Sequence, residues 1–417
     1  MLASPNQSFV IVGAGQAGGR AAEAMRKAGF QGRVILIGDE AEPPYERPPL
    51  SKAILVGAKP HGSCQLLPSG FYKENEIELL TETRVIALDP AAHRVKLADG
   101  REVGYDKLVL ATGGRVRELP FAPIGRAGVY YLRTVKDSLT LGAALRRAKR
   151  FVVIGGGFLG LEAAASARKL GLEVTVVECL PAILDRAMHP KIAEYVAALH
   201  RRNGVEIRTG ITVSEIASDS KVEAVICRDG SRIAADLVLV AIGILPNVEL
   251  AEAAGAAIEN GIKVDEFGRT TLEDVYAVGD VANHPNPILG RRLRLESWQN
   301  AQNQAIAVAR GLCGAPQPYA EVPWFWSDQY DANIQMVGVP QETDDVVFRG
   351  DPTSGRFTAF NIARHRVVGA TAFNMGGEIR FARKMIETGT TPTLDALADP
   401  RHKLKDLVAA HAASSQA

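Results

Sequence analysis

The sequence predicts an α/β protein in which one strand–helix–strand unit occurs twice. Composition is the first observation, because 47% of the residues are hydrophobic but only 6% are aromatic, which suits the aliphatic strands of buried parallel sheets. The second observation is a pair of glycine-rich turns, each directly after a short aliphatic strand. The third is length, because 417 residues exceed one compact domain and favour two or three.

The first unit begins with the aliphatic strand 9–12 and continues through a G-x-G-x-x-G turn. The glycines of this turn are Gly13, Gly15 and Gly18, with Ala17 before the last. We expect a helix over about 19–28 and a second strand over 34–37. The acidic residues Asp39 and Glu40 follow that strand, after an intervening Gly38.

The second unit repeats this design near the middle of the chain. Strand 151–154 leads into another G-x-G-x-x-G turn, whose helix is expected to end near Leu170. The glycines of this turn are Gly155, Gly157 and Gly160. A second strand over 173–177 follows and ends at Glu178. Two copies with strand, helix and acidic residue in place are much stronger evidence than one glycine turn, which is often purely structural.

Glycine is needed at these turns for physical reasons. The first glycine permits a tight turn, the second lets the backbone approach a pyrophosphate, and the third lets helix and strand pack closely. The free N–H groups and partial positive charge of the helix N-terminus then face the phosphates. An acidic side chain after the second strand binds ribose hydroxyls. The sequence therefore predicts two Rossmann-like dinucleotide-binding domains.

Two further strands end in glycine. Strand 108–111 runs into an A-T-G sequence, and strand 275–278 runs into Gly279 and Asp280. A glycine at a strand end lets backbone approach a ligand, and an aspartate there can accept a hydrogen bond from a ribityl hydroxyl. Either segment alone could be an ordinary buried strand with a turn. Beside two dinucleotide-binding units, both favour contact with a cofactor.

Charge and cysteine content argue against several classes of protein. Lys and Arg (48) nearly balance Asp and Glu (47), so the chain as a whole has no general attraction for nucleic acid or anionic membranes. The longest apolar stretch, 237–245, is far shorter than the roughly 20 residues that span a bilayer. The short polar start fits no signal peptide, and the four cysteines are far apart, as in reduced intracellular thiols. We expect a cytoplasmic protein that binds no metal, with a turn rather than a histidine ligand at 283–285.

Six segments carry a resemblance to a known family. They are R-P-P-L-S-K at 47–52, A-T-G-G at 111–114, Y-L-R-T at 131–134, G-G-G-F-L-G-L-E at 155–162, V-G-D at 278–280 and P-W-F-W-S-D-Q at 323–329. With them the sequence resembles the two-dinucleotide flavoprotein reductases of glutathione-reductase-like architecture. Within that group it is similar, over essentially the whole chain, to the NADH-dependent ferredoxin reductases of bacterial oxygenases, the putidaredoxin reductase type.

The resemblance implies three domains. An FAD-binding domain would comprise residues 1–114 and 245–322, interrupted by an NAD-binding domain at 115–244. A small α+β domain at 323–417 would cover the flavin side. Insertion of one domain into the other would explain why the second glycine turn comes so late and why Asp280 returns to FAD.

The resemblance also assigns cofactor contacts. For FAD these are Gly13, Gly15, Ala17, Gly18, Asp39, Lys52, Val85, Ala111, Thr112, Gly113, Arg133, Gly279, Asp280, Trp298 and Trp326; for NAD they are Gly155, Gly157, Gly160 and Glu178. Asp39 would hold the adenosine ribose, although the family's acid normally follows the strand directly and Gly38 displaces it here. Val85 would meet the adenine through its backbone. Trp324, two residues before Trp326 in the same segment, is expected in the core.

Lys52 and Glu162 are the residues that the resemblance places beside the reactive edge of the flavin. Glu162 lies two residues past the third glycine and is expected on the first turn of its helix. A lysine there would stabilise negative charge on reduced flavin, and the carboxylate would keep the lysine paired in a desolvated setting. An ordinary interdomain salt bridge is the alternative. No proton-abstracting group is required, because hydride passes directly between the rings.

Glu178 bears on the choice of nicotinamide. Its carboxylate can bind both hydroxyls of an unmodified ribose but would repel a 2′-phosphate, and residues 179–181 supply no arginine to hold that phosphate. NADH is therefore expected in preference to NADPH.

The electron acceptor is predicted to be an acidic [2Fe–2S] ferredoxin. Disulfide reductases of this superfamily need a redox cysteine pair near the segment that 45–52 occupies here, and that segment contains no cysteine. Candidate basic docking patches are Arg291, Arg292 and Arg294; Arg310; and Arg380, Arg383 and Lys384. A rubredoxin reductase, an NADH oxidase and a redox-sensing interaction protein like apoptosis-inducing factor remain alternatives on the same scaffold.

Overall fold

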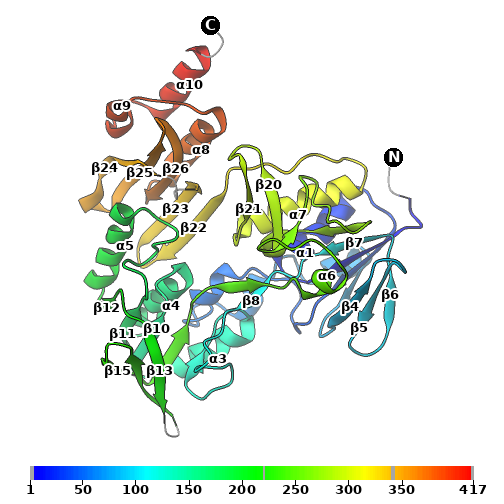
Figure 1. Cartoon of the computed structure of the whole chain (residues 1–417), viewed down its shortest axis with the longest axis horizontal. Helices are drawn as coiled ribbons and strands as arrows, with labels where there is room; N and C mark the ends of the chain where they lie inside the picture. Colours follow the sequence, from blue (N-terminus) through cyan, green and yellow to red (C-terminus); the bar gives the residue numbers. More distant parts are fainter. Residues whose placement is uncertain (1–3, 219–220, 340–342, 415–417) are drawn as a thin grey trace. The chain divides into compact units, whose positions relative to one another are not determined.

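The structure of the chain is a computed structural model that describes residues 4–218, 221–339 and 343–414. The chain divides into two compact units, which Figure 1 shows coloured along the sequence. Unit 1 comprises Met1–Arg47, His61–Arg115 and Ile244–Glu321, and unit 2 comprises Pro48–Pro60, Val116–Gly243 and Val322–Ala417. Each unit is therefore assembled from segments that are far apart in the sequence.

Unit 1 is built on a five-stranded parallel sheet with the order β19-β7-β1-β2-β3. Its strands are β1 (Ser8–Val12), β2 (Arg33–Ile37), β3 (Ile77–Leu80), β7 (Lys107–Leu110) and β19 (Val275–Ala277). Alternate residues of β1 enter different core clusters: Phe9 and Ile11 belong to one, Val10 and Val12 to the other. Both faces of the sheet are thus buried, as the continuous aliphatic runs predict.

Helices cover one face of this sheet, and small sheets contribute to the cover of the other. The helical side contains α1 (Gln16–Lys27), which packs against β1, β2 and α7 (Trp298–Leu312). The other elements of unit 1 are α2 (Phe71–Glu74), α6 (Glu249–Ala253), the sheet of β4 (Val85–Asp89), β5 (Arg94–Leu97) and β6 (Glu102–Gly104), and the sheet of β18 (Ile262–Lys263), β20 (Ala282–Asn286) and β21 (Arg291–Arg294). Val95 and Ile262 join Val10 in the second cluster.

Unit 2 contains a second five-stranded parallel sheet, with the order β12-β11-β10-β16-β9. Its strands are β9 (Val129–Tyr130), β10 (Arg150–Ile154), β11 (Glu173–Val177), β12 (Val205–Arg208) and β16 (Leu237–Val240). The strand after the glycine turn lies on one side of β10, and a strand from much later in the chain lies on the other. This is the arrangement around β1, so the sequence repeat is also a structural repeat.

Helices and a small antiparallel sheet make up the rest of this part of unit 2. They are the short 3₁₀ helix η1 (Pro48–Ser51), the helices α3 (Val135–Leu145), α4 (Phe158–Lys169) and α5 (Pro190–Arg202), and the antiparallel sheet of β13 (Val213–Ser218), β14 (Val222–Cys227) and β15 (Arg232–Ala234). Helix α4 packs against β10, β11 and η1. Val152 and Ile154 of β10 share a core cluster with Val225 of β14.

The C-terminal part of unit 2 is an antiparallel sheet with helices. Its strands, in the order β22-β23-β26-β25-β24, are β22 (Trp324–Gln329), β23 (Ala332–Gly338), β24 (Asp345–Asp351), β25 (Arg356–Ala363) and β26 (Arg366–Phe373). Three helices follow: α8 (Ile379–Thr388), α9 (Leu394–Ala398) and α10 (Leu404–Ser414). Helix α8 packs on β23 and β26, and β22 packs against α4 (Figure 1).

Three local predictions need correction. Helix α1 begins at Gln16, directly after its N-cap Gly15, and not near Gly19. Glu162 is the fifth residue of α4, which begins at Phe158, so it opens the second helical turn rather than lying in the first. Residues 283–285 lie in strand β20, paired with β21, rather than in a turn. In the first two cases the helix starts directly after the second glycine of the pattern. The free N–H groups at the start of the helix are therefore part of the glycine turn.

The α/β fold with two dinucleotide-type sheets is confirmed. Two more strands, β8 (Gly114–Val116) and β17 (Ile244–Pro246), pair where the chain passes from unit 1 to unit 2 and where it returns. A search of the described helices for one long and apolar enough to cross a membrane finds none.

Candidate functional site

The first glycine turn lies at the carboxyl end of β1. A Cβ placed on Gly13 would lie 2.2 Å from the Ala111 carbonyl oxygen, and one on Gly18 would lie 1.9 Å from the Gly13 oxygen. By contrast, a Cβ on Gly15 would have no atom within 4 Å. Two of the glycines are therefore required by packing within unit 1, whereas Gly15 borders open space at the start of α1.

The second glycine turn has the same geometry. A Cβ on Gly155 would lie 2.3 Å from the Ala241 oxygen, and one on Gly160 would lie 2.3 Å from the Gly155 oxygen. Nothing lies within 4 Å of a Cβ on Gly157. The open position again directly precedes a helix, as a backbone that must approach a pyrophosphate requires. Both turns therefore fit a dinucleotide.

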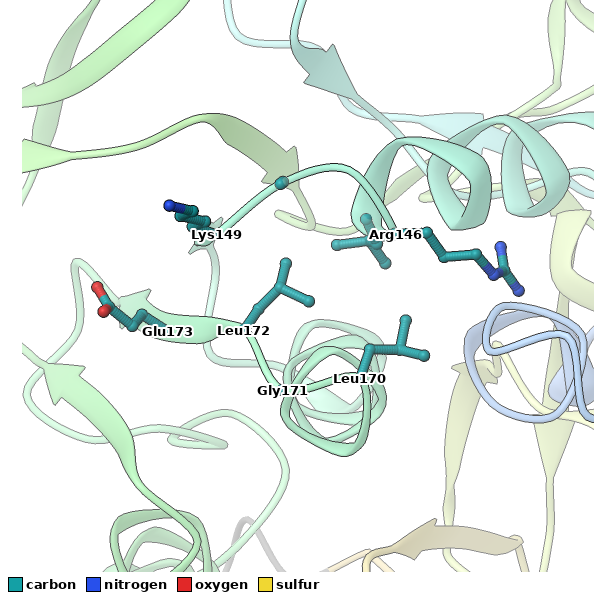
Figure 2. A pocket seen from close by; sticks show the side chains of 8 residues that line it. Arg146, Lys149, Leu170, Gly171, Leu172 and Glu173 are labelled. Atoms are coloured by element: carbon teal, nitrogen blue, oxygen red, sulfur yellow. The ribbon is translucent and has the colours of Figure 1, made fainter.

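A hollow of about 410 Å³ lies at the other end of the second sheet, where β10 and β11 begin. Figure 2 shows it lined by Lys149 and Glu173, which directly precede or begin β10 and β11, and by Leu170 and Leu172. Ligands of open parallel sheets bind outside the carboxyl ends of the strands, and this hollow is at their amino ends. We therefore assign it no part in dinucleotide binding.

Glu178 lies directly after β11 and its carboxylate is bound by backbone. Its Oε2 accepts a hydrogen bond from the Gly156 N–H at 2.7 Å, and its Oε1 accepts one from the Leu180 N–H at 2.9 Å. The Cys179 thiol also lies 3.3 Å from Oε1. These contacts hold the negative charge beside the second glycine turn, where an adenosine ribose would lie in such a fold.

The first unit differs at the equivalent position, which is Gly38. A Cβ there would lie 2.5 Å from the Cβ of Ala14, so the tight approach of turn and strand excludes a carboxylate. Asp39 is exposed. Glu40 is half-buried and accepts hydrogen bonds from the Tyr45 hydroxyl at 2.5 Å and from Arg47 at 2.6 Å. Of the two acids, Asp39 is the one that makes no such bond to a side chain among the described residues.

Four other predicted FAD residues of unit 1 lie just after the carboxyl ends of β7 and β19, beside the first glycine turn: Ala111, Thr112, Gly113 and Gly279. Gly279, with a φ of 77°, faces Ala17, whose Cβ would be 3.0 Å from a Cβ on Gly279. The Thr112 hydroxyl donates to the Asn247 carbonyl at 2.8 Å, and the Asn247 N–H donates to the Gly113 carbonyl at 3.0 Å.

Asp280, Trp298 and Val85 lie on three further elements of unit 1. Asp280 is on the 3₁₀ turn η3 (Gly279–Val281), which packs against α7, and Trp298 is the first residue of α7. Burial lowers the pKa of Arg47, but Tyr45, Glu40 and, to a smaller extent, Asp280 raise it above its usual value. Val85 is buried at the start of β4.

Three predicted FAD residues belong to unit 2. Arg133 is half-buried before α3, and its backbone N–H donates to Asp137 at 3.0 Å. Trp326 is half-buried on β22 and stacks on Trp324, with ring centroids 5.1 Å apart. Trp324 is thus a half-buried stacking partner rather than a core residue, because strand alternation puts it on the same face as Trp326. Lys52 is the third.

Lys52 and Glu162 form an ion pair within unit 2. Lys52 Nζ lies 2.7 Å from Glu162 Oε2 and also donates to the Pro48 carbonyl at 3.0 Å. Glu162 is buried, with 6% of its surface exposed, whereas 21% of the Lys52 side chain is exposed. Among the described residues these two contacts use two of the three N–H groups of Lys52, which leaves one for a ligand.

The sequence reasoning missed several residues around this pair. Ser51 donates its hydroxyl to Glu162 Oε2 at 2.5 Å, and Ser327 donates to Oε1 at 2.6 Å. Gln329 and His200 continue the contacts beyond Ser327. Signals were present, since Ser51 lies inside the R-P-P-L-S-K segment and residues 327 and 329 lie inside the P-W-F-W-S-D-Q segment. No pattern pointed to His200.

Comparison with known proteins places these features in a family. The family described as pyridine nucleotide-disulphide oxidoreductase matches residues 7–305, and the reductase C-terminal domain matches residues 324–408. The ferredoxin–NAD(+) reductase component of the anthranilate 1,2-dioxygenase system of Burkholderia cepacia is 44% identical over 400 residues, which is 95% of this chain and 98% of the relative. Putidaredoxin reductase of Pseudomonas putida is 39% identical over 411 residues, covering 97% of each chain.

Solved structures agree with these relatives. The reductase chain of the covalent putidaredoxin reductase–putidaredoxin complex matches with a TM-score of 0.95 and 39% identity, over 98% of this chain and 99% of that one. The ferredoxin reductase for the CYP199A2 system of Rhodopseudomonas palustris matches with a TM-score of 0.93 at 39% identity, over 97% of this chain and 100% of that one. The chain therefore belongs to the pyridine nucleotide-disulphide oxidoreductase family and, within it, to the FAD- and NAD(H)-dependent ferredoxin reductases.

Proposed function

We propose that this chain transfers electrons from NADH through FAD to an acidic [2Fe–2S] ferredoxin that serves an oxygenase of the P450 or Rieske type. FAD, when bound, accepts a hydride from NADH and releases electrons singly, which suits a one-electron acceptor. The observation that carries the proposal is the pair of matching glycine turns in a chain whose relatives are reductases of oxygenase systems. The residues of the chain bind, orient and tune the two cofactors.

FAD is assigned to the first glycine turn. Gly13, Gly15 and Gly18, with Ala17, cradle the pyrophosphate at the N-terminus of α1. Asp39 holds the adenosine ribose, and Val85 contacts the adenine. The remaining contacts are assigned to Lys52, Ala111, Thr112, Gly113, Arg133, Gly279, Asp280, Trp298 and Trp326. The support is the open space at Gly15 and the convergence of 111–113 and Gly279 on the same turn in unit 1.

NADH is assigned to the second turn. Gly155, Gly157 and Gly160 cradle its pyrophosphate, and Glu178 binds its adenosine ribose. A carboxylate that the Gly156 and Leu180 N–H groups already hold would repel a 2′-phosphate. This preorganised charge favours NADH over NADPH.

Lys52 and Glu162 are assigned to the nicotinamide-facing edge of the flavin. The ammonium of Lys52 stabilises negative charge on the reduced ring, and Glu162 holds that ammonium in place. An isolated exposed ion pair would contribute little. The burial of Glu162 and its two serine donors support a tuning role instead.

The ferredoxin is assigned to a basic face of α8. Arg380, Arg383 and Lys384 lie at helical spacing opposite the buried residues Ala382 and Met385. Arg380 and Lys384 are exposed, and Arg383 is half-exposed. Opposite charges at such a dock speed association more than they strengthen binding.

The other candidate patches offer less. Arg292 donates to the Val264 and Asn283 carbonyls, and Arg294 donates to the Asp280 carbonyl and pairs with Glu296. These two side chains are committed inside unit 1. Arg310 is exposed but single.

The domain division and the location follow the same proposal. We assign 1–114 and 245–322 to an FAD domain, 115–244 to an NAD domain and 323–417 to a C-terminal domain over the flavin. A cytoplasmic location is supported by the four cysteines, all of which are free thiols.

The decisive experiment is stopped-flow reduction of the purified holoenzyme by NADH, followed by a [2Fe–2S] ferredoxin. We expect fast flavin bleaching by NADH but not by NADPH, then rapid ferredoxin reduction with little oxygen uptake. Bleaching without transfer to an iron–sulfur carrier would favour an NADH oxidase if oxygen is consumed rapidly. A long-lived charge-transfer complex would favour a redox sensor like apoptosis-inducing factor, and preference for rubredoxin would name a rubredoxin reductase.

A further inference from the structure

A continuous chain of hydrogen bonds leads from Glu162 to His200 inside unit 2. Glu162 Oε1 accepts from the Ser327 hydroxyl at 2.6 Å, and the Ser327 oxygen accepts from Gln329 Nε2 at 3.0 Å. Gln329 Oε1 then lies 2.7 Å from His200 Nε2. The Tyr330 hydroxyl follows, 3.4 Å from His200 Nδ1. The chain thus connects α4, β22 and α5.

Every member between Glu162 and His200 is removed from solvent. Ser327 and His200 are 0% exposed, and Gln329 is 1% exposed. Polar groups buried to this degree must satisfy one another, because each unpaired group would destabilise the fold. This series of hydrogen bonds is therefore an ordered feature of the fold and not a chance set of surface contacts.

Donor and acceptor directions along this chain are determined. Glu162 accepts from Lys52 and Ser51 at Oε2, and the Ser327 hydroxyl donates to its Oε1. Gln329 presents its NH₂ group to Ser327 and its carbonyl oxygen to His200, so His200 Nε2 carries the proton. Burial lowers the pKa of His200 to about 4, which keeps the ring neutral with Nδ1 as an acceptor for Tyr330.

The amide of Gln329, in the middle of this chain of hydrogen bonds, rules out a proton relay. Gln329 cannot pass a proton along by ordinary exchange, since its nitrogen donates and its oxygen accepts. The arrangement is suited to orientation. Each bond fixes the next side chain, as a carboxylate orients the histidine of a catalytic triad or of a metal site.

We propose that Ser327, Gln329 and His200 are positioning residues, which keep the Glu162 carboxylate oriented toward Lys52. The inference rests on the proposed role of Lys52 and Glu162 at the flavin. Strand β22 would thereby support the reduction of the flavin by NADH, because two of the three residues come from that strand. Without the Ser327 donor, the carboxylate would lose the hydrogen bond at Oε1 that favours its charged form, and its hold on Lys52 would weaken.

The charged groups around Glu162 in this unit are few. The elements packed against α4 are η1, β10, β11 and β22. Their titratable residues, with those that directly follow these elements, are Lys52, Arg150, Glu173, Glu178, Asp328 and Tyr330. The Tyr330 hydroxyl lies against His200. Arg150 and Glu173 start their strands, and Asp328 points to the opposite face and bonds Asn333. Glu178 is held by backbone, as described above. Lys52 is therefore the one cation in the described part of this unit that pairs with Glu162.

The test is the pH dependence of holoenzyme variants, read in two ways. One is the flavin absorbance of the oxidised protein without NADH, and the other is the rate of flavin reduction by NADH; neither uses ferredoxin. Ser327→Ala removes a hydrogen bond to a charged group, so we expect both pH midpoints to rise by about one to two pH units. Gln329→Met and His200→Phe should raise them by progressively less, and His200→Gln should restore the original midpoint.

Ser138→Ala is the matched control. Ser138 is also 0% exposed, and its hydroxyl donates to the Leu50 carbonyl at 2.6 Å, beside Ser51 but without contact to Glu162. This variant shows how the loss of one buried hydroxyl changes stability when Glu162 keeps all its hydrogen bonds. If Ser327→Ala and Ser138→Ala give coincident pH profiles, the inference is overturned even if both proteins are destabilised.

Glu162→Gln separates this inference from the proposed function. Loss of the pH step in Glu162→Gln, with a shifted step in Ser327→Ala, supports the chain of positioning residues. A step that persists in Glu162→Gln overturns the inference, because another group would then be titrating. If the unchanged holoenzyme reduces no ferredoxin, the proposed function is wrong. The shift in pH midpoint of Ser327→Ala would still support the positioning role, because neither readout uses ferredoxin.

Discussion

At the scale of single residues, Glu178 and Gly38 occupy equivalent positions in the two dinucleotide units. Glu178 directly follows β11 and bonds the backbone of the second turn. Gly38 directly follows β2, where a Cβ would strike Ala14 at 2.5 Å. The sequence alone shows that the first acid is displaced. The reason for the displacement, a closer approach of turn and strand, is visible in the three-dimensional structure.

Replacement of Glu178 tests the choice of nicotinamide. Glu178→Gln keeps hydrogen-bonding groups but removes the charge, so the preference for NADH over NADPH should fall. Glu178→Ala should in addition lower kcat/KM for NADH by about 10–100-fold, the equivalent of one or two hydrogen bonds. Steady-state kinetics with a small dye as acceptor measure both effects. An unchanged ratio of NADH to NADPH in both variants would contradict the assignment.

His284 predicts a pH dependence of stability. The side chain is 1% exposed, and within the described residues neither ring nitrogen has a hydrogen-bond partner. Burial, helped by the charge of Arg292, lowers its pKa to about 4. The unfolded chain takes up a proton near pH 6.5 whereas the folded chain does not until about pH 4, so the free energy of unfolding falls as pH decreases through this window.

The expected loss from His284 is about 2 kcal/mol at pH 5 relative to pH 7. His284→Phe should remove that part of the loss, because the ring stays beside Tyr319 but no longer titrates. Urea unfolding at the two pH values measures it. Equal losses in the variant and the unchanged chain would show that His284 is not responsible.

At the scale of secondary-structure elements, the two glycine turns are alike because each joins a strand to a helix by the same packing. The third glycine lies within the first helical turn and touches the carbonyl of the first glycine. This close contact explains why α1 starts at Gln16, earlier than periodicity alone predicts. The first helical turn consists largely of small residues, which give little amphipathic signal.

The second turn allows packing and ligand approach to be separated by substitution. Gly160→Ala should prevent stable folding of unit 2, since its Cβ would lie 2.3 Å from a backbone oxygen. Gly157→Ala should leave the fold intact but weaken NADH binding by about 10–100-fold, because a methyl group would stand where the pyrophosphate approaches. Thermal unfolding and NADH titration distinguish these effects. Tight NADH binding by a folded Gly157→Ala protein would remove the turn from the site.

Helix α8 makes a separate prediction about the electron acceptor. Arg383→Glu with Lys384→Glu should slow ferredoxin reduction markedly and leave dye reduction unchanged, because only the protein partner docks on the basic face. Lys73→Glu with Lys96→Glu is the matched control, since both lysines are exposed in unit 1 and the change in net charge is the same. Equal rates with ferredoxin in the two variants would exclude α8 as the dock.

At the scale of the whole molecule, the formal net charge is only +1. The overall field is therefore weak, and attraction of an acidic partner must come from a local patch. Ferredoxin reduction at limiting concentration should slow as salt rises from about 0.01 M to 0.15 M, over which the Debye length falls from about 30 to 8 Å. Dye reduction should not change. A flat salt response with ferredoxin would argue against electrostatic docking.

Much of the fold was predictable because it depends on local patterns. The strand over 173–177 matches β11 in full, and the strand over 9–12 differs from β1 by one residue. The pairing of β1 with β7, and of β7 with β19, was beyond pattern reasoning, since nearly a hundred residues or more separate the partners. Such contacts depend on packing of the whole unit, which no short window of sequence contains.

The pairing of Lys52 with Glu162 was implied by the family resemblance and not by spacing. By itself the sequence determined the α/β class, the two dinucleotide turns and the acid at 178. These follow from residue type and spacing near a strand end, where local geometry leaves few choices. Only the tertiary structure decided that Ser51, Ser327, Gln329 and His200 complete the surroundings of Glu162. They come from three segments separated by more than a hundred residues each, and a buried carboxylate recruits its donors through space, not along the chain.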